Sequence, residues 1–379
     1  MSRARDRASS SPTISGDLTV SGDLVPSTPL SHRNMIINGG MNVAQRSTSS
    51  TSSGYNTVDR FYYEWATVGA TQSQLAITSG DPFDVGFRYV YRLTNTSVTT
   101  TTSAYTKLVQ NIEAQNIAGS GWNYTSTSSY VTLSFWARSS LAGTYYSQLR
   151  TVDGTEYLYS KAFVLAANTW LKVTMTVPGN SNLTINNDNG KGMEVDIYPH
   201  VGTDNSGGGE VTTESWYTRG GQADAYLPNF AQAWMNTASA TFDVTGVQLE
   251  LGSNATPFEH RSYGDELQRC QRYFQRLGIG TNATALGMGM TSTTTTAQVA
   301  VPLATVMRAS PTVTVSNMTV TDWQNYTSAL SDPANTYATA SHVSLNFNRD
   351  QSPAWGEFRP CLYTIGGSGT GYTNFTAEL

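Results

Sequence analysis

Residues 131–138 read Val131-Thr132-Leu133-Ser134-Phe135-Trp136-Ala137-Arg138. Apolar and polar side chains alternate here with a period of two, which places them on opposite faces of a β-strand. β-Branched and aromatic residues favour strands over helices. The stretch therefore predicts a strand with one face in a core. Trp136 stands opposite the apolar positions, so it is either a core residue of a second face or an outward platform.

Similar strands are predicted on either side of this stretch. Leu171, Val173, Met175 and Val177 alternate with polar residues, and the run 242–251 forms another strand in which Gly246 marks a bulge or break. Thirty-three glycines supply turns. Many short strands with no long helix between them predict an all-β protein with a β-sandwich over residues 35–261.

Composition limits the functional classes. Charged residues are 13% of the 379 residues, the net charge is −5, and only four of the 22 basic residues are lysine. A general nucleic-acid or anionic-membrane binder needs a basic surface, so neither partner is expected. Arg3, Arg5 and Arg7 precede no apolar run, which argues against a signal peptide, and no apolar run is long enough for membrane insertion. Cys270 and Cys361 fit no metal or disulfide pattern and are expected to be reduced thiols.

The N-terminal segment 1–34 contains a short repeat. Ser15-Gly16-Asp17-Leu18-Thr19-Val20 is followed by Ser21-Gly22-Asp23-Leu24-Val25-Pro26. Stacked copies would bury the apolar face of such a unit, as in fibre shafts, although a linker with a chance duplication fits as well. The polar arm before the repeat, with Arg3, Arg5 and Arg7, is predicted to order by docking on an acidic partner surface.

A short helix is predicted within residues 262–280. Leu267, Cys270, Phe274 and Leu277 fall at spacings of three, four and three, which is the a/d pattern of a coiled coil. We interpret the segment as a trimerising helix; the alternative is a helix that lies on the sandwich. Residues 281–379 resume the strand pattern and predict a smaller C-terminal β domain.

Several motifs together resemble a domain found in many bacteriophage tail-fibre proteins. The resemblance covers about residues 33–278 and is weaker toward the end of the sequence. The motifs are the segments 33–46, 59–61, 131–138, 242–252, 256–259, 270–274 and 375–379. The domain is similar to jelly-roll carbohydrate-binding modules, which implies binding and not catalysis.

The resemblance also bears on metal binding. Related jelly rolls often hold a structural calcium ion near their first and last strands. Asn38-Gly39-Gly40 lacks an acidic residue, and Asp243 stands alone, whereas calcium usually takes several carboxylates. No metal and no cofactor is therefore expected.

One strand permits a catalytic interpretation. Glu194, Asp196, Tyr198 and His200 share one face of a strand at 193–200. Two such carboxylates could serve a glycosidase as acid and nucleophile. The favoured interpretation is a polar or ligand-contacting face, because no GxSxG, HExxH or P-loop motif accompanies the pair. The chain is expected not to be an enzyme.

Sugar binding needs aromatic rings beside hydrogen-bonding groups. Two kinds of position combine them: aromatic loops rich in Gly, Ser and Asn, and the polar face of the 193–200 strand. The candidate contacts are Trp122, Tyr124, Glu194, Asp196, Tyr198, Trp323, Asn325, Tyr326, Tyr337 and Trp355.

The leading hypothesis is a homotrimeric tail fibre that adheres to host surface polysaccharide. Its N-terminus would bind a virion tail or adaptor protein, and residues 281–379 would form the receptor-binding tip. The rival receptor site is the sandwich itself, through Trp122, Tyr124 and the strand that carries Glu194. The protein would assemble in the host bacterial cytoplasm and reside in the virion. The alternatives are a fibre-borne glycan depolymerase that uses Glu194 and Asp196, and a capsid or neck fibre with a mainly structural role.

Overall fold

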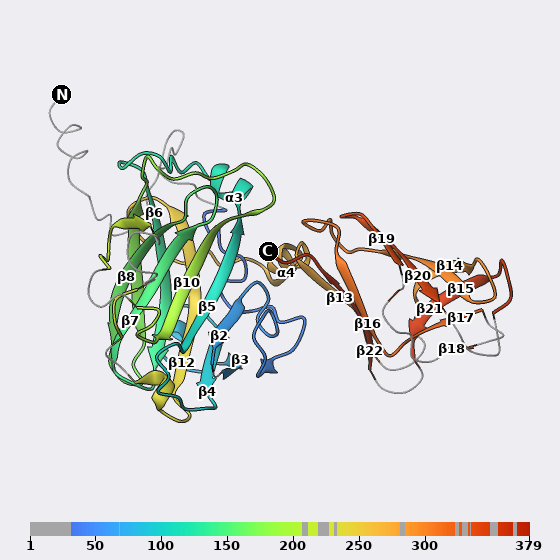
Figure 1. Cartoon of the computed structure of the whole chain (residues 1–379), viewed down its shortest axis with the longest axis horizontal. Coiled ribbons are helices and arrows are strands. Elements are labelled where there is room, and N and C mark those ends of the chain that lie inside the picture. Colours follow the sequence, from blue (N-terminus) through green and yellow to red (C-terminus); the bar gives the residue numbers. More distant parts are fainter. Residues whose placement is uncertain are drawn as a thin grey trace, which may run out of the picture.

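The computed structural model describes residues 32–67, 69–206, 211–218, 227–230, 233–280, 285–322, 326–327, 333, 335–348, 355–366 and 370–379. These residues form two β-rich bodies that follow one another along the long axis of the molecule (Figure 1). Within this part of the chain, no helix has the length and hydropathy needed to cross a membrane.

The N-terminal body is a β-sandwich of two six-stranded antiparallel sheets, which confirms the prediction of an all-β sandwich. The first, sheet A, contains in spatial order β1 (Ser49–Ser50), β3 (Ala70–Ala76), β4 (Tyr89–Asn95), β12 (Thr241–Leu251), β6 (Tyr130–Ser139) and β9 (Leu171–Pro178). Strands β4 and β12 lie at its middle. The stretch 131–138 falls within β6, which lies between β12 and the edge strand β9 and confirms the predicted strand.

The second sheet, sheet B, faces sheet A across the core. It contains in spatial order β11 (Trp216–Thr218), β8 (Tyr157–Leu165), β7 (Gly143–Thr151), β10 (Lys191–Val201), β5 (Tyr105–Glu113) and β2 (Tyr62–Ala66). Consecutive strands repeatedly cross from one sheet to the other, a pattern typical of jelly-roll sandwiches.

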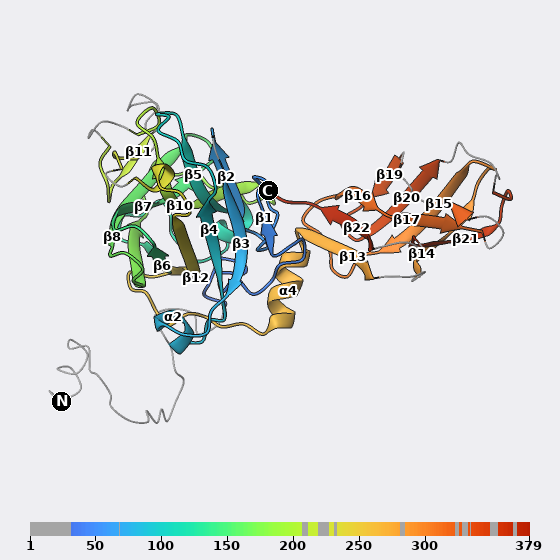
Figure 2. The same ribbon diagram turned by 90° about the horizontal axis from the view of Figure 1, so that it is seen from below.

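Short helices occupy the loops and ends of the sandwich. They are α2 (Asp81–Asp84), α3 (Ala114–Ala118), the 3-10 turn η2 (Trp234–Asn236) and α4 (Tyr263–Gln271). Figure 2 shows α2 at the lower edge of the sandwich and α4 on the side that faces the C-terminal body. Their shortness agrees with the expectation that no long helix interrupts the strands.

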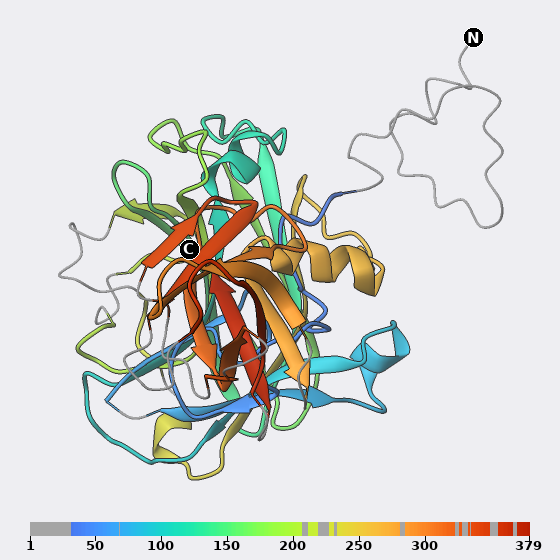
Figure 3. The same ribbon diagram turned by 90° about the vertical axis from the view of Figure 1, so that its right-hand side faces the viewer.

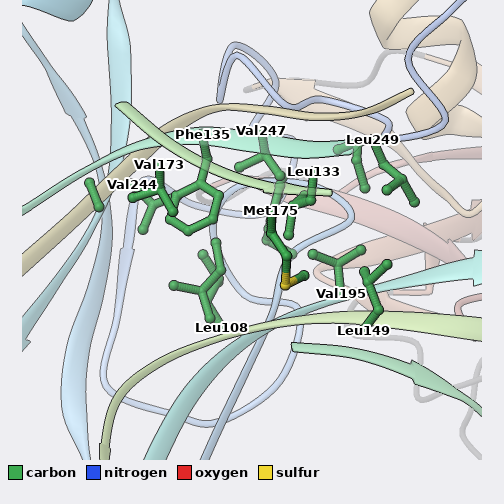
Figure 4. Close-up of a cluster of buried hydrophobic side chains, with 14 of the residues drawn as sticks. Leu108, Leu133, Phe135, Leu149, Val173, Met175, Val195, Val244, Val247 and Leu249 are labelled. Carbon is green, nitrogen blue, oxygen red and sulfur yellow. The ribbon is translucent and has the colours of Figure 1, made fainter. Parts of the chain in front are cut away.

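The sandwich core is formed by the inward side chains of both sheets. Leu133 and Phe135 of β6 meet Leu108 of β5 and Leu149 of β7, all at most 2% exposed (Figure 4). Burying one such side chain contributes roughly 1.5–3 kcal/mol, so the alternating positions largely hold the two sheets together.

The C-terminal body packs two further sheets around a separate core. The smaller contains β13 (Phe274–Gly280), β22 (Gly371–Thr376) and β16 (Thr312–Ser316). The larger contains β18 (Tyr326–Thr327), β17 (Met318–Thr321), β21 (Pro360–Ile365), β14 (Ala285–Thr291), β15 (Thr296–Pro302), β20 (His342–Asn348) and β19 (Asn335–Ala338). In Figures 1 and 2 the smaller sheet lies nearer the sandwich.

The prediction of a helical seam through Leu277 is wrong. Helix α4 ends at Gln271, and Phe274 and Leu277 belong to β13, which pairs with β22. Cys270 and Phe274 are at most 1% exposed inside the single chain, while Leu277 packs on the C-terminal core. The heptad spacing therefore reflects intramolecular burial on a helix followed by a strand, and Leu267 is left half-buried.

Buried polar contacts join the two bodies where the sequence ends. Glu378 forms ion pairs with Arg46 and with Arg60, whose side chain is 1% exposed. Arg272 forms a bidentate pair with Glu113, both bonds 2.8 Å long. Figure 3, viewed along the long axis, shows α4 and the end of the chain where the two bodies meet. The junction is therefore fixed by charged groups and not by an apolar hinge.

Candidate functional site

The outer face of sheet B carries the predicted polar strand. Glu194, Asp196 and Tyr198 of β10 point away from the core, whereas Val195 and Ile197 enter it, so the predicted face holds for these three residues. For His200 the regular alternation does not hold, because β10 shifts its register against β5 between Ile197 and His200. Tyr198 also lines a small hollow that offers about 100 Å³. The other lining residues come mainly from neighbouring strands and are Glu64, Tyr105, Lys107, Arg150, Val201 and Asn205.

Lys107 is the central charge of this face. Its Nζ lies 3.3 Å from Glu64 Oε2 and 3.5 Å from Asp196 Oδ1. Tyr198 donates a hydrogen bond to Asp196 Oδ2 at 3.2 Å, and Tyr105 donates one to Glu64 Oε1 at 2.7 Å. Lys107 thus has two carboxylate partners, although Asp196 Oδ1 accepts no hydrogen bond from the described residues.

Glu194 is held in a second cluster beside the first. Arg150 lies 3.0 Å from Glu194 Oε2 and 2.6 Å from Glu156, and Lys191 also bonds Glu194. Burial alone would raise the pKa of Glu194, but Lys107, Arg150 and Lys191 together hold that pKa below its usual value. Glu194 is therefore a carboxylate at neutral pH.

The pKa of Asp196 is shifted in the opposite direction to that of Glu194. Its side chain is fully buried, and this desolvation raises the pKa of Asp196 above its usual value in spite of Lys107. Opposite shifts in two neighbouring carboxyl groups are typical of acid–base pairs. A general acid must, however, reach the glycosidic oxygen, and Asp196 has no exposed surface. The described geometry thus offers no contact between Asp196 and a substrate.

The outer face of sheet A has a different character. Asp243 of β12 accepts hydrogen bonds from Arg92 of β4 and from Arg138 of β6, at 2.6–3.0 Å. Two cations thus surround one buried carboxylate. Asp243, expected from the sequence to stand alone, is an ion-pair centre that links β4, β12 and β6.

Beside this cluster lies an open groove. It offers about 460 Å³, within the range of roughly 300–1,000 Å³ common for ligand pockets. Trp136 and Ser134 of β6 line its floor, and Lys172 of β9 stands directly opposite Trp136 in the strand register. Lys172 forms no ion pair with the described residues. Trp136 is therefore an outward, half-buried platform, which resolves the alternative left open by the sequence.

The groove depends on the bulge at Gly246. Strand β12 shifts its register against β6 between Thr245 and Gln248, and Gly246 adopts a φ of +66°. A Cβ atom there would lie 2.6 Å from Phe87 and 3.1 Å from Trp136. Only a glycine lets both rings lie against the backbone at this point.

An aromatic trio forms the far wall of the groove. The rings of Phe87, Phe258 and His260 lie with centroids 4.8–5.1 Å apart. The His260 ring makes a 3.1 Å hydrogen-bond contact with the backbone oxygen of Val85, which also lines the groove. The groove therefore combines fixed aromatic surface with Lys172, Ser134 and Thr256 as polar groups.

Two predicted sugar platforms are wrong. Trp122 is 3% exposed and donates its indole N–H to the Ser129 carbonyl, and Trp355 is 2% exposed in the C-terminal core. Tyr124 is half-buried against the sandwich core. Each loop uses its tryptophan for packing, because an indole buries a large apolar area.

The remaining predicted residues lie partly outside the described part of the chain. Trp323, Asn325 and the attachment residues Arg3, Arg5 and Arg7 fall outside it. Tyr326 lies on β18, and Tyr337 lies on β19 opposite Ser344 of β20. The roles predicted for these residues stay predictions.

The opening motif has a structural role. Asn38, with a φ of +61°, donates its side-chain amide to the carbonyls of Val43 and Asp59. A Cβ atom at Gly39 would lie 2.0 Å from the Val247 carbonyl. The motif thus anchors the first segment on β12. Among the described residues, no group of three or more His, Cys, Asp or Glu side chains is placed to hold a metal ion.

Sequence reasoning missed Lys107, Arg150 and Lys172. Each occupies an outward position on a strand, which the period-two pattern reveals. Asp196, which pairs with Lys107, and Glu194, which pairs with Arg150, lie on a strand tens of residues away. The pattern therefore does not show which charge faces which carboxylate.

Comparison with protein-family models and with curated proteins finds no match. Solved structures show a remote likeness. One described as "CBM4 structure and function" is 11% identical, with 57% of this chain and 98% of that chain covered and a TM-score of 0.29. The N-terminal cellulose-binding domain of Cellulomonas fimi β-1,4-glucanase C is 10% identical, with 56% and 99% covered and a TM-score of 0.28.

A tandem CBM22 domain from Paenibacillus barcinonensis Xyn10C is 10% identical, with 93% of both chains covered and a TM-score of 0.27. These structures are carbohydrate-binding modules, as the sequence resemblance implied for the sandwich, and none of the three shows a bacteriophage fibre. TM-scores this low establish neither a shared fold nor a shared function.

Proposed function

We propose that the protein is a non-enzymatic adhesive protein that binds surface polysaccharide in the groove on the outer face of sheet A. The observation that carries this proposal is the open Trp136 ring beside Lys172, a cation without an ion-pair partner in the described part of the chain. Trp136 differs in this respect from Trp122 and Trp355, which are 3% and 2% exposed.

The groove suits a pyranose ring. The indole face of Trp136 covers the apolar C–H face of the sugar, while Ser134 and Thr256 are placed along the groove to bond its hydroxyls. Lys172 favours a glycan that carries carboxylate or phosphate groups, because its charge is not neutralised within the protein. The preferred ligand is therefore an acidic polysaccharide.

The viral role is the finer part of the proposal. We infer a homotrimeric tail fibre from the motifs at 33–46, 131–138 and 242–252. Residues 1–31, expected to bind the virion, lie outside the described chain. A capsid or neck fibre is the alternative, and immunogold labelling of virions distinguishes the two by the position of the label.

The depolymerase alternative is tested separately. A Glu194→Gln variant should bind polysaccharide like the wild type, because Glu194 is engaged by Arg150 and Lys191 away from the groove. Polysaccharide cleavage by the wild type that disappears in Glu194→Gln would establish the enzyme and overturn the non-enzymatic proposal.

The binding proposal is tested with full-length Trp136→Ala. Loss of the ring should weaken binding to immobilised host polysaccharide by about tenfold, which corresponds to roughly 1.4 kcal/mol. Tyr105→Ala is the matched control, because it removes an aromatic ring from the hollow on sheet B. Weakened binding in Tyr105→Ala with unchanged binding in Trp136→Ala would move the site to sheet B, and unchanged binding in both variants would refute sugar binding on either face.

A further inference from the structure

Strand β14 of the C-terminal body places methionines on its solvent-exposed face and glycines on the face toward the core. Met288 and Met290 are 69% and 52% exposed on the outer face of the seven-stranded sheet. Gly287 and Gly289 occupy the alternate positions, which face the core. A sheet with one solvated face normally places apolar residues inward and polar residues outward, so β14 reverses that pattern.

Packing explains the glycines but not the methionines. A Cβ atom at Gly289 would lie 1.8 Å from the Gln298 carbonyl, and one at Gly287 would lie 2.7 Å from the Ala300 carbonyl. The inward positions thus have no room for a side chain. Both edges of β14 are paired, with β21 and with β15, and the two methionine side chains stay largely exposed beside the residues that the structure describes.

The residues that lie opposite the two methionines in the neighbouring strands carry no charge. In the strand register Met288 lies opposite Ala300 of β15 and Leu362 of β21, and Met290 lies opposite Gln298 and Pro360. Strand β20 follows β15 in the sheet, and its Ser344 and Asn346 lie opposite Ala300 and Gln298 of β15. These described positions form a neutral surface around an apolar centre, which we name the β14 face: Met288, Met290, Gln298, Ala300, Ser344, Asn346, Pro360 and Leu362.

Such a surface suits contact with a copy of itself. In a closed homo-oligomer each subunit presents the same patch near the symmetry axis, so a charged residue there would approach its own like charge. The centres of protein interfaces are depleted of charge and enriched in methionine and aromatic residues. The β14 face satisfies both conditions, whereas 13% of the whole chain is charged.

We propose that the β14 face is the surface through which copies of this chain associate. The contact lies in the C-terminal body, away from α4, whose expected seam is used within one chain. It supplies the self-association that the fibre proposal needs, but it does not depend on polysaccharide binding. The occupant is a further copy of this chain, and an unrelated receptor on this face is an outcome of the test.

The test is sedimentation velocity of the full chain over a concentration series. Wild type should sediment as an oligomer, and Met288→Glu/Met290→Glu should sediment as a monomer. Val306→Glu is the matched control, because Val306 is 57% exposed and lines a hollow beside Arg269 and Arg272, away from the β14 face. A monomeric wild type, or a double variant that still assembles, overturns the proposal.

A second measurement uses the wild type without a disruptive substitution. Exposed methionine is oxidised to sulfoxide by hydrogen peroxide, whereas covered methionine is protected. Met290 should be oxidised almost as slowly as the buried Met307, and Met288→Glu should abolish that protection. Rapid oxidation of Met290 in the wild type would mean that no copy covers the face.

The two proposals can fail separately. Trp136→Ala should remain an oligomer with weakened polysaccharide binding. Met288→Glu/Met290→Glu should be a monomer that retains single-site affinity but loses avidity on a polysaccharide surface. Loss of single-site affinity in this double variant would place a receptor contact on the β14 face and contradict the proposed self-association.

Discussion

The two outer faces of the sandwich differ in whether their lysine and arginine side chains have carboxylate partners. On sheet B, Lys107, Arg150 and Lys191 each form an ion pair with at least one carboxylate. The hollow on this face has a volume of only about 100 Å³. On sheet A, Lys172 has no ion-pair partner among the described residues and lies beside Trp136 in a groove of about 460 Å³. A face whose charges are internally paired supports the fold, whereas a face with an unpaired charge is available to a ligand.

The largest expected effect comes from breaking the pairing on sheet B. Lys107→Met leaves Asp196 buried without its cation, and removing one partner of a buried pair costs about 3–5 kcal/mol. Lys107→Met/Asp196→Asn should recover much of that loss, because no uncompensated charge remains. Urea unfolding measures both. A single variant as stable as the wild type would show that the pair does not support the fold.

A smaller loss is expected on the open face. Gly246→Ala forces a Cβ atom into Phe87 at a left-handed φ, and such strain costs of order 1–3 kcal/mol. It should also narrow the groove and weaken polysaccharide binding. Gly264→Ala in α4 is the control, because nothing lies within 4 Å of its Cβ position. It should leave stability unchanged or raise it slightly, and an equal loss in both variants would contradict the role of the bulge.

The closed face also predicts a pH dependence. Burial lowers the pKa of His200 to about 4, so the folded state holds the imidazole neutral. Between about pH 6.5 and pH 4 the unfolded chain binds a proton that the folded chain does not, and stability falls as the pH falls. From pH 7 to pH 5 the wild type should lose about 1–2 kcal/mol more than His200→Gln. Burial also raises the pKa of Asp59 to about 6, so this group makes the folded state more stable as the pH falls. The comparison with His200→Gln isolates the contribution of His200, because Asp59 is present in both proteins.

The smallest effect belongs to an exposed pair on the same sheet. Lys161 lies 3.1 Å from Glu214, but the two side chains are 34% and 58% exposed. Lys161→Met should change the unfolding free energy by less than about 1 kcal/mol. It is the matched counterpart of Lys107→Met, and equal losses in the two variants would mean that burial does not explain the difference between the pairs.

The strands were predictable because their signal is local. The alternation at 131–138 and 171–177 falls within β6 and β9, and Gly246 marks a real bulge. The end of the helix at Gln271 and the strand after it were not predictable. Phe274 and Leu277 belong to a strand because they pair with residues near 375, about a hundred positions later in the sequence. A heptad spacing carries no information about that partner.

The site was predictable in the same partial sense. Period two correctly placed Glu194, Asp196 and Tyr198 on one face, but it did not show that Lys107 and Tyr198 cover Asp196. Nor could it place Lys172 beside Trp136, because this depends on the register of β6 with β9. Long-range pairing, and not residue type, decides which face is closed.

The position of Glu378 has a consequence for biosynthesis. The sandwich strands are all translated by Leu251, yet Arg60 acquires its carboxylate partner only when Glu378 leaves the ribosome. Arg46, which can already pair with Asp59, gains its second carboxylate at the same time. Strand β13 likewise waits for β22. During that interval the nascent chain exposes an unpaired strand edge, which is prone to pairing with other chains. Translation speed across residues 281–379 should therefore influence how much of the protein folds correctly.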